Sequence, residues 1–242
     1  MIKKIEGIVV SETSYGESSK IINIFTKEHG IIGVMAKGAK SLKSKLRNYA
    51  CTFTYGYFHM YYKEGKLSTL IECELINEFK EIKTDLILLS YMTYLIELTT
   101  QIYKQNNESQ IYDYLISTLL KINQGLDPLV LTNILEVKLL DYLGVGLKLD
   151  GCVKCGNNKN IITINEKNGG FICKNCLTKE VIYSEKVIQM IRMYYLIEID
   201  SISSLNISED VKTSINEFLN QYYDQYTGLY LNSKKYLEKI TK

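Results

Sequence analysis

The chain has 242 residues, of which 46% are hydrophobic and 23% charged, and its formal net charge is +2. These values lie close to the averages of globular proteins and exclude a disordered or fibrous protein, and the length allows one large domain or two small ones with an insertion. The longest uncharged apolar stretch, Leu86 to Ile96, has 11 residues, fewer than the roughly 20 that a membrane helix needs, so we expect a soluble protein without membrane contact.

We expect no export signal at the N-terminus, because Glu6 and Glu12 interrupt the apolar run before a signal-peptide core can form. We therefore expect a cytoplasmic protein. In that compartment the six cysteines are expected to be metal ligands or buried thiols rather than disulfides.

The charge is distributed unevenly along the chain. Residues 1–80 hold 12 basic and 8 acidic side chains, a net charge of +4, whereas residues 81–242 hold 17 and 19, a net charge of −2. No acidic residue occurs between Glu28 and Glu64. The chain as a whole is nearly neutral, but its N-terminal third is basic and the rest is slightly acidic.

The first 77 residues read as short β runs separated by turn residues. The expected strands are residues 5–10, 20–25, 31–36, 51–62 and 67–76. Five short strands with a longer polar connection between the third and the fourth indicate a small barrel of the OB type, with an SH3-like barrel as the alternative.

From residue 79 the apolar period changes to that of a helix. Apolar residues at 79, 82, 86, 89, 92 and 96 are spaced by three or four, and those at 115, 119 and 122 continue the pattern. Asp127-Pro128 predicts a helix start and Gly144 its end, while Ser184 and Ser208 each precede acidic residues at expected helix starts.

Four of the six cysteines have the spacing of a metal site. Cys152, Cys155, Cys173 and Cys176 form C-x2-C-x17-C-x2-C, a pattern typical of one structural zinc ion held by four thiolates. Residues 161–164 and 169–172 are expected to be the two strands of a zinc ribbon. The alternatives are two redox-active pairs or a ribbon without metal. Cys51 and Cys73, in strand-like contexts, are expected to be ordinary buried residues.

These patterns together predict an α+β protein with three parts. An OB-fold β-barrel is expected over residues 1–80, a helical domain over 81–150 and 178–242, and a four-cysteine zinc-ribbon-like insertion over 151–177.

A basic segment and an aromatic strand in the front part are candidates for binding nucleic acid. The segment contributes Lys37, Lys40, Lys43, Lys45 and Arg47. If it is helical after Gly38, three of these cations share one face at the spacing i, i+3, i+7. The alternative is a solvated loop.

Aromatic side chains alternate along the following strand at Phe53, Tyr55, Tyr57 and Tyr61, with His59 among them. Such a face beside cations suits stacking of single-stranded bases, with Tyr55 and Tyr57 as the candidate contacts. The alternative for these aromatics is the core of the barrel, and the alternation alone leaves both interpretations open.

The sequence lacks the usual catalytic patterns. It contains no phosphate-binding G-x-x-x-x-G-K-[ST] loop, no G-x-G-x-x-G after a strand, no H-E-x-x-H and no G-x-S-x-G. We therefore expect a protein that is not an enzyme.

The order of several short motifs resembles the RecO family of bacterial DNA repair and recombination mediators. The motifs are Ile5-Glu-Gly-Ile-Val-Val10, Tyr15-Gly-Glu17, Phe25-Thr-Lys-Glu-His-Gly30, Ala36-Lys-Gly-Ala-Lys40, Glu136-Val-Lys-Leu-Leu140, Leu143-Gly144, the two cysteine pairs and Ser233-Lys234. The family often has a proline-containing stretch after the basic segment, where this chain has Cys51-Thr-Phe-Thr54, so the resemblance does not define the start of the fourth strand.

The resemblance implies an OB-fold, a helical domain and a zinc-binding insertion. It also implies a non-enzymatic, nucleoid-associated protein that binds single- and double-stranded DNA, anneals complementary strands and works with RecR to load RecA onto single-stranded DNA coated by SSB. By motif position, the five cations of residues 37–47 become the leading DNA contacts.

Other functions and contacts are kept open. An OB plus zinc-ribbon adaptor for RNA or a transcription complex has the same parts, and a redox protein would use the cysteine pairs. For the acidic, hydrophobic C-terminal tail of SSB, the candidate cations are Arg192, Lys234 and Lys235. The alternative for these three is a solvated helix end.

Overall fold

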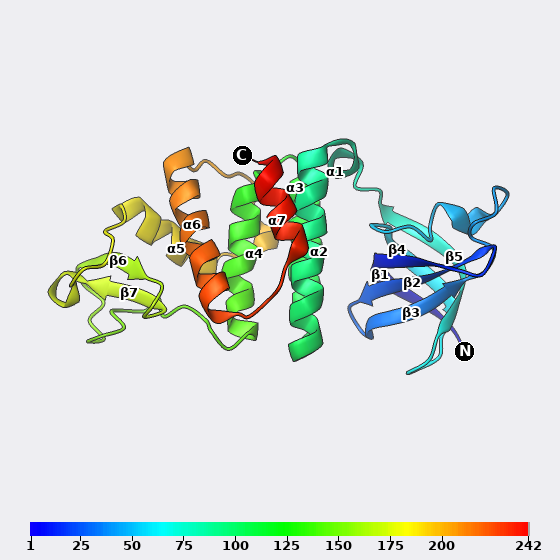
Figure 1. The fold of residues 1–242 in the computed structure, drawn as a ribbon, viewed down its shortest axis with the longest axis horizontal. Coiled ribbons are helices and arrows are strands. Elements are labelled where there is room, and N and C mark those ends of the chain that lie inside the picture. The colour runs from blue at the N-terminus through cyan, green and yellow to red at the C-terminus, as the bar shows by residue number, and fades with distance from the viewer. Residues whose placement is uncertain (242) are drawn as a thin grey trace. The chain divides into compact units, whose positions relative to one another are not determined.

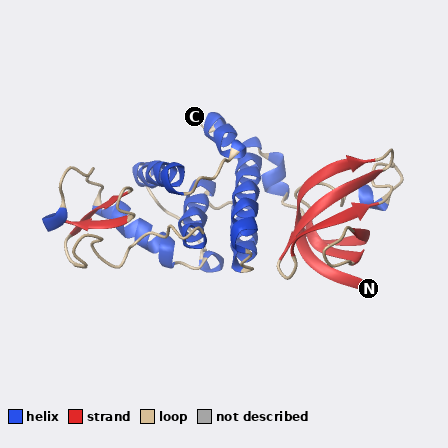
Figure 2. Ribbon diagram, turned by 60° about the horizontal axis from the view of Figure 1, so that its bottom comes forward, coloured by secondary structure: helices blue, strands red, loops and turns tan. Residues whose placement is uncertain are grey.

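A computed structural model describes residues 1–241 of the protein (Figure 1). The chain forms two compact units, one from residues 1–80 with 107–113 and the other from residues 81–106 with the chain from 114 onward. Strands dominate the first unit and helices the second (Figure 2). No helix within residues 1–241 has the length and apolar character required to cross a membrane.

The first unit is a closed five-stranded barrel, as predicted. Its strands are β1 (Ile2–Tyr15), β2 (Ser19–Thr26), β3 (Gly30–Ala36), β4 (Tyr55–Tyr61) and β5 (Ser68–Asn77). They close in the order β1-β2-β3-β5-β4. All neighbours are antiparallel except β3 and β5, which pair in parallel at Val34↔Ser68 and Met35↔Thr69. This closed barrel confirms the OB-type architecture.

The interior of the barrel is filled by alternate side chains of every strand. The buried set includes Ile5, Val9, Ile22, Ile24, Val34, Phe58, Met60, Leu70 and Cys73. Gly7 on β1 pairs with Gly56 on β4. A Cβ atom at Gly7 would lie 2.5 Å from Ile24, and one at Gly56 would lie 2.4 Å from the Glu74 carbonyl oxygen. These two glycines therefore allow adjacent strands to approach closely where the barrel curves.

The fourth strand begins later than predicted. Residues 51–54 form a turn, and β4 starts at Tyr55 instead of Cys51. Phe53 has a φ of 70°, and its N–H donates to the Val9 carbonyl at 2.8 Å while Val9 N–H donates to Thr54 at 2.9 Å. The turn thus supplies the hydrogen-bond partners of Val9 on β1. A longer β4 would otherwise have supplied them.

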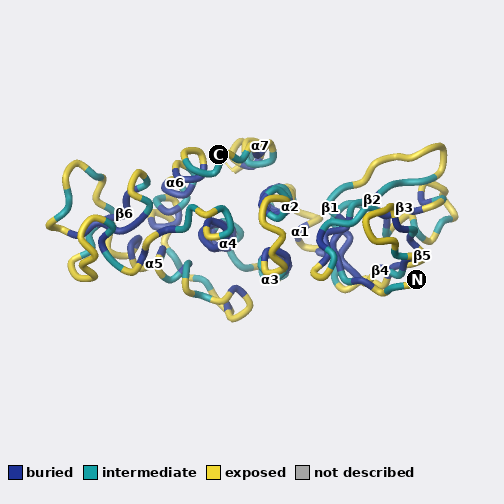
Figure 3. The backbone as a smooth tube through the Cα atoms, turned by 90° about the horizontal axis from the view of Figure 1, so that it is seen from below, coloured by how far each residue is buried: buried dark blue, intermediate teal, exposed yellow. Residues whose placement is uncertain are grey.

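The second unit is helical and carries a small β-hairpin. Its elements are α1 (Lys80–Thr84), α2 (Leu86–Asn106), α3 (Gln110–Asn123), α4 (Pro128–Tyr142), β6 (Ile161–Asn165), β7 (Gly170–Cys173), α5 (Glu185–Leu196), α6 (Glu209–Tyr226) and α7 (Asn232–Ile240). Every residue of α4 from Val130 to Leu140 is buried, as the dark segment labelled α4 in Figure 3 illustrates. A helix that is buried on all sides forms the centre of its domain.

The predicted helix starts are correct at three positions, and one expected helix is divided. Asp127 accepts hydrogen bonds from Leu129 N–H and Val130 N–H at 3.0 and 3.1 Å, which caps α4. The run that begins at Phe79 is broken at Asp85, whose carboxylate caps α2 by accepting from Ile87 N–H at 2.7 Å. This local side-chain bond competes with continuation of the preceding turn.

A buried carboxylate joins four helices of the second unit. Glu136 on α4 is 1% exposed and accepts a short hydrogen bond from the Tyr94 hydroxyl on α2. Lys234 on α7 lies 3.5 Å from the same carboxylate, and Tyr223 on α6 donates to the Glu136 carbonyl at 2.9 Å. Removing a charge from water is costly without such partners, so these contacts fix how the helices pack.

Asp127 offers a test of this packing, because it caps α4 and also pairs with the mostly buried Lys212 of α6 at 2.7 Å. We expect Asp127→Ala to lower the free energy of unfolding by about 1–2 kcal/mol, measured by urea denaturation followed by circular dichroism. Ser208→Ala is the matched control, since Ser208 precedes α6 but makes no side-chain capping bond. Equal losses in the two variants would contradict the capping role.

Candidate nucleic-acid interface and metal centre

The four predicted metal ligands come together at one point of the hairpin insertion. The Sγ atoms of Cys152, Cys155, Cys173 and Cys176 all lie within 4.8 Å of one another. Cys155 Sγ and Cys173 Sγ are 3.7 Å apart, close to the edge of about 3.8 Å that a tetrahedron with 2.3 Å metal–sulfur bonds requires. The donor set therefore fits a four-coordinate ion that prefers sulfur, and no fifth ligand is needed.

The pKa values of two thiols in the cluster shift in opposite directions. Burial would raise the pKa of the Cys152 thiol, but backbone N–H groups, led by that of Cys173, lower it to about 6. Hydrogen bonding to Cys155 raises the pKa of the Cys176 thiol to about 12. The protein alone therefore favours one thiolate and opposes another. A bound cation would remove this opposition, because metal sites hold cysteine as thiolate.

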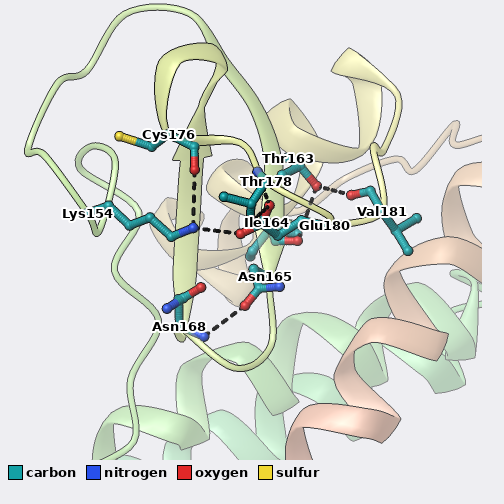
Figure 4. Close-up of polar contacts among 9 residues, drawn as sticks. All are labelled: Lys154, Thr163, Ile164, Asn165, Asn168, Cys176, Thr178, Glu180 and Val181. Atoms are coloured by element: carbon teal, nitrogen blue, oxygen red, sulfur yellow. Dashed lines mark hydrogen bonds and ion pairs between the residues drawn. The ribbon is translucent and has the colours of Figure 1, made fainter.

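Polar bonds hold the chain that surrounds the cluster. Lys154 Nζ donates to the Cys176 carbonyl at 3.1 Å and pairs with the Glu180 carboxylate at 2.7 Å (Figure 4). The second oxygen of Glu180 accepts from Thr178 N–H at 2.6 Å. The segments before and after the hairpin are thereby tied to each other next to the sulfur atoms.

The hairpin has the turn that the sequence predicts. Asn165 accepts from Asn168 N–H at 2.9 Å, and Gly169 has a φ of +64°, which favours glycine. A Cβ atom at Gly170 would lie 2.3 Å from the Lys148 carbonyl oxygen. Gly169 and Gly170 therefore let β7 pass close to the chain at Lys148, which leads into the insertion.

The remaining cysteines differ from each other. Cys73 is 7% exposed in the barrel core, and burial raises the pKa of its thiol to about 12. Cys51 is only half-buried, in the turn before β4, and its thiol donates to the Arg47 carbonyl at 3.1 Å. The expectation of a buried residue is correct for Cys73 and wrong for Cys51, which follows from the later start of β4.

The basic segment is an exposed loop rather than a helix. Residues 37–44 are turns, and only Lys45–Arg47 forms a short 3-10 helix. The predicted helical ridge of Lys40, Lys43 and Arg47 is therefore wrong. The loop is instead bound to the β1–β2 hairpin, because Lys40 N–H donates to the Ser18 carbonyl at 2.8 Å.

The cations of this loop are available for contacts. Lys37, Lys40, Lys43, Lys45 and Arg47 are all exposed. The loop leaves β3 at Ala36, which pairs with Lys20 at the start of β2. It therefore lies at one end of the surface formed by β2 and β3.

That surface was not predicted as a candidate from the sequence. Ile21 pairs with Met35 and Asn23 with Gly33, and all four residues are half-buried on the outer side of the barrel. The odd-numbered residues of the two predicted strands, 20–25 and 31–36, could have indicated this face, because the even-numbered residues beside them fill the core. OB folds bind oligonucleotides through the face of strands 2 and 3 and the loops beside it.

The aromatic strand lies on another side of the barrel. Phe58 and Met60 are buried in the core, so Tyr57 and Tyr61 point outward and are 37% and 52% exposed. Tyr55 is only 5% exposed and donates to the Glu6 carboxylate at 2.7 Å. A buried, hydrogen-bonded ring cannot stack on a base, so the candidate role of Tyr55 is not supported by its position.

Carboxylates surround the exposed tyrosine that was expected to contact bases. Tyr57 pairs across the sheet with Glu6 on β1 and with Glu74 on β5. Lys4 lies 4.6 Å from the centre of the Tyr57 ring and is bound to Glu74 at 2.6 Å. The cation in contact with the Tyr57 ring is therefore Lys4 of β1 and not one of the loop cations.

The three candidate partner contacts have different surroundings. Arg192 donates twice to the Leu149 carbonyl, at 2.7 and 3.2 Å, and Lys234 is held by Glu136. Lys235 is exposed, 4.2 Å from the centre of the Tyr230 ring, and both line a cavity of about 240 Å³. Among the three, Lys235 is the one whose charge is not already used by a buried or backbone acceptor.

Comparisons with known proteins cover both units. The family Recombination protein O N terminal matches residues 1–79, and the family Recombination protein O C terminal matches residues 83–235. The chain is 35% identical to the DNA repair protein RecO of Halalkalibacterium halodurans over 99% of its length and 96% of that protein. It is 35% identical to RecO of Listeria monocytogenes over 100% and 96%, and 34% identical to RecO of Bacillus pumilus over 99% and 95%. The chain belongs to the RecO family of DNA repair proteins.

Proposed function

We propose that the protein is a non-enzymatic DNA repair mediator that acts on DNA at the nucleoid. It binds single- and double-stranded DNA, anneals complementary strands and, with RecR, helps to load RecA onto single-stranded DNA coated by SSB. The observation that carries the proposal is the acid-free basic loop of residues 37–47 at the end of the β2–β3 face, in a chain of the RecO family.

The chemistry of the loop suits contacts to the DNA backbone. Four of its five cations are lysines, which act as mobile point charges, whereas bidentate recognition of bases favours arginine. Contacts to phosphates leave the Watson–Crick edges free, and annealing requires those edges to meet a second strand. Tyr55 and Tyr57 are left out of the proposed contact, because one is buried and the other lies among carboxylates.

The cysteine cluster is proposed to hold one structural zinc ion. Four thiolates leave no open position for substrate or water, so the ion would stabilise the fold of the insertion and not perform a reaction. Between the cysteine pairs the insertion buries few apolar side chains, among them Ile164, Phe171 and Ile172. A core this small is usually insufficient without a metal.

Contacts to the other proteins of the pathway are proposed for the helical unit. Lys235 and Tyr230 border the cavity of about 240 Å³, so a cation and an aromatic ring stand beside a hollow, as an acidic, hydrophobic tail requires. Lys234 and the carboxylates of Asp224 and Glu238 line the same cavity. We propose this position for the C-terminal tail of SSB, with Lys235 as the cation that meets the tail, Lys234 held by Glu136 and Arg192 in a structural role.

Zinc content tests the metal proposal. We expect purified protein to contain one zinc ion per chain under reducing conditions, measured by elemental analysis. Cys155→Ser and Cys176→Ser should lose the metal, because a structural site requires all four ligands. Cys51→Ser should keep it, since Cys51 lies in the barrel unit. Metal-free wild-type protein with unchanged unfolding in chelator would overturn the proposal and favour the redox alternative.

The loop is tested by replacing Lys40, Lys43 and Arg47 with Ala. The expected result is weaker binding of a single-stranded oligonucleotide and a salt dependence reduced by about 2 in log–log slope, since each phosphate contact contributes about 0.7. Fluorescence anisotropy at several salt concentrations measures both quantities, and annealing of complementary strands should slow in parallel.

A variant with Ala at Lys104, Lys186 and Lys239 is the control, because it removes three exposed cations from α2, α5 and α7. Wild-type affinity and slope in the loop variant would remove the loop from the proposed site. Tighter binding of matched RNA than of DNA would favour the RNA adaptor instead.

A further inference from the structure

The four cysteines of the metal site are not equally protected from solvent. Cys152 and Cys173 are 2% and 1% exposed, whereas Cys176 is half-buried and Cys155 is exposed. We call Cys155 and Cys176 the outer cysteines. A competing ligand reaches exposed sulfur atoms more easily than buried ones, so loss of a bound ion would begin at the outer cysteines.

The hairpin of the insertion positions the two buried cysteines. Cys173 is the last residue of β7 and pairs with Ile161 on β6. Cys152 precedes Val153, whose N–H donates to the Phe171 carbonyl on β7 at 2.8 Å. Both buried sulfur atoms are therefore carried by backbone that is hydrogen-bonded to the small sheet.

The chain after the outer Cys176 has no such support from secondary structure. Residues 177–184 belong neither to a helix nor to a strand. Side-chain hydrogen bonds fix this segment instead, because the Glu180 carboxylate accepts from the N–H and the hydroxyl of Thr178 at 2.6 and 3.0 Å. The position of Cys176 therefore depends on contacts made by the residues that follow it.

One ion pair joins this segment to the first cysteine pair. Lys154 stands between Cys152 and Cys155 in the sequence. Its ammonium group donates to the Cys176 carbonyl at 3.1 Å and to the Glu180 carboxylate at 2.7 Å (Figure 4). The hydrogen bonds to this carboxylate, led by that from Lys154, lower the pKa of Glu180 to about 2, so the group is charged at neutral pH. We call Lys154 and Glu180 the clasp.

The clasp restrains both outer cysteines at once. Lys154 is the immediate neighbour of Cys155, and its side chain binds the backbone of Cys176. The side chains of Lys154 and Glu180 are 32% and 8% exposed, so the pair is screened less than an ion pair in open water. Movement of either outer cysteine away from the cluster would have to stretch or break the clasp.

A positive charge next to the cluster also suits a bound metal. Four thiolates carry more negative charge than one divalent ion neutralises, so a cation held beside them stabilises the loaded site. Lys154 supplies this charge, and Glu180 keeps it at the Cys176 carbonyl. Lys167 and Lys179 line the same cavity of about 380 Å³ as the clasp, but in the described part of the chain no hydrogen bond or ion pair ties their side chains to the cysteines.

We propose that the Lys154–Glu180 clasp keeps Cys155 and Cys176 in place around the metal and so controls how fast the ion is lost. The hairpin positions the two buried cysteines, and the clasp positions the two outer ones. Lys154 and Glu180 are positioning residues, since neither is a ligand. This inference rests on the zinc site proposed above.

The rate of zinc release from the full chain tests the clasp, measured by transfer of the ion to an excess of a coloured chelator. We expect Lys154→Met and Glu180→Ala each to release zinc about tenfold faster than wild type, because loss of an outer-shell partner weakens metal binding to that extent. Lys154→Arg keeps the charge and the donors and should stay within about threefold of wild type.

Lys167→Met and Glu166→Ala are the matched controls. Both residues line the same cavity as the clasp, but neither side chain forms a hydrogen bond or ion pair with Lys154 or Glu180 within residues 1–241. Zinc should leave these two variants at the wild-type rate. Equally fast release from the controls and from the clasp variants would overturn the proposal, because any change in the cavity would then have the same effect.

Alkylation of the zinc-loaded protein separates the clasp from a general loosening of the insertion. Brief treatment with iodoacetamide, followed by mass spectrometry, identifies the modified cysteines. In Lys154→Met and Glu180→Ala we expect faster modification of Cys155 and Cys176, while the two buried cysteines stay as protected as in wild type. An equal gain at all four would overturn the proposal, since it would mean that the insertion unfolds.

The zinc content of the wild-type protein distinguishes failure of this inference from failure of the proposed metal site. Wild-type protein without zinc would overturn both. One zinc ion per wild-type chain, together with release from Lys154→Met and Glu180→Ala at the wild-type rate, would overturn the clasp and leave the metal site standing.

Discussion

A carboxylate that loses contact with water needs partners, and each unit of this chain contains one such group: Glu136 is buried and Glu6 is half-buried. In the helical unit Glu136 accepts a hydrogen bond from the Tyr94 hydroxyl and forms an ion pair with the Lys234 ammonium group. In the barrel unit Glu6 accepts hydrogen bonds from the Tyr55 hydroxyl at 2.7 Å and from the Tyr112 hydroxyl at 3.3 Å. Burial raises the pKa of each of these tyrosines, so they stay protonated and able to donate. The partners come from distant parts of the sequence, and the bonds therefore specify the packing.

The site elements depend on these arrangements. The end of α4 and the chain that leads into the cysteine insertion are held by Tyr222, which donates to the Val145 carbonyl at 3.0 Å, and by Arg192 through the Leu149 carbonyl. The insertion is thus attached to α6 and α5 as well as to the chain on either side. A metal ion bound by the four sulfur atoms would add a further link within a segment that α5 and α6 already hold.

Much of this organisation could be predicted because it is local. The two cysteine pairs and the Asp127 cap each depend on residues within a few positions of one another, so spacing alone was sufficient. The loop of residues 37–47 could not be predicted in the same way. Its i, i+3, i+7 cations fit a helix, but hydrogen bonds to the β1–β2 hairpin and to Ser44 hold the loop in turns instead. Tertiary contacts of this kind override a weak local pattern.

The aromatic strand illustrates a second limit. A period of two divides β4 into two faces but does not say which is buried, and Phe58 and Tyr57 are similar in apolar character. The neighbours across the sheet decide it, since β5 places Cys73 opposite Phe58 and Glu74 opposite Tyr57. Lys234 is a similar case, because the sequence made it a candidate contact for an acidic tail, with a solvated helix end as the alternative, and only the fold brings it to Glu136. No single stretch of sequence shows which distant segment will pair with it.

The distribution of charge on the barrel has a consequence for how it would approach DNA. A net charge of +4 over residues 1–80 would attract phosphates from any direction if it were spread evenly. Here five exposed cations stand together in the loop of residues 37–47, within a stretch of the sequence that has no acidic residue. Positive charge concentrated in this way attracts an anion toward one place on the barrel rather than evenly toward its whole surface.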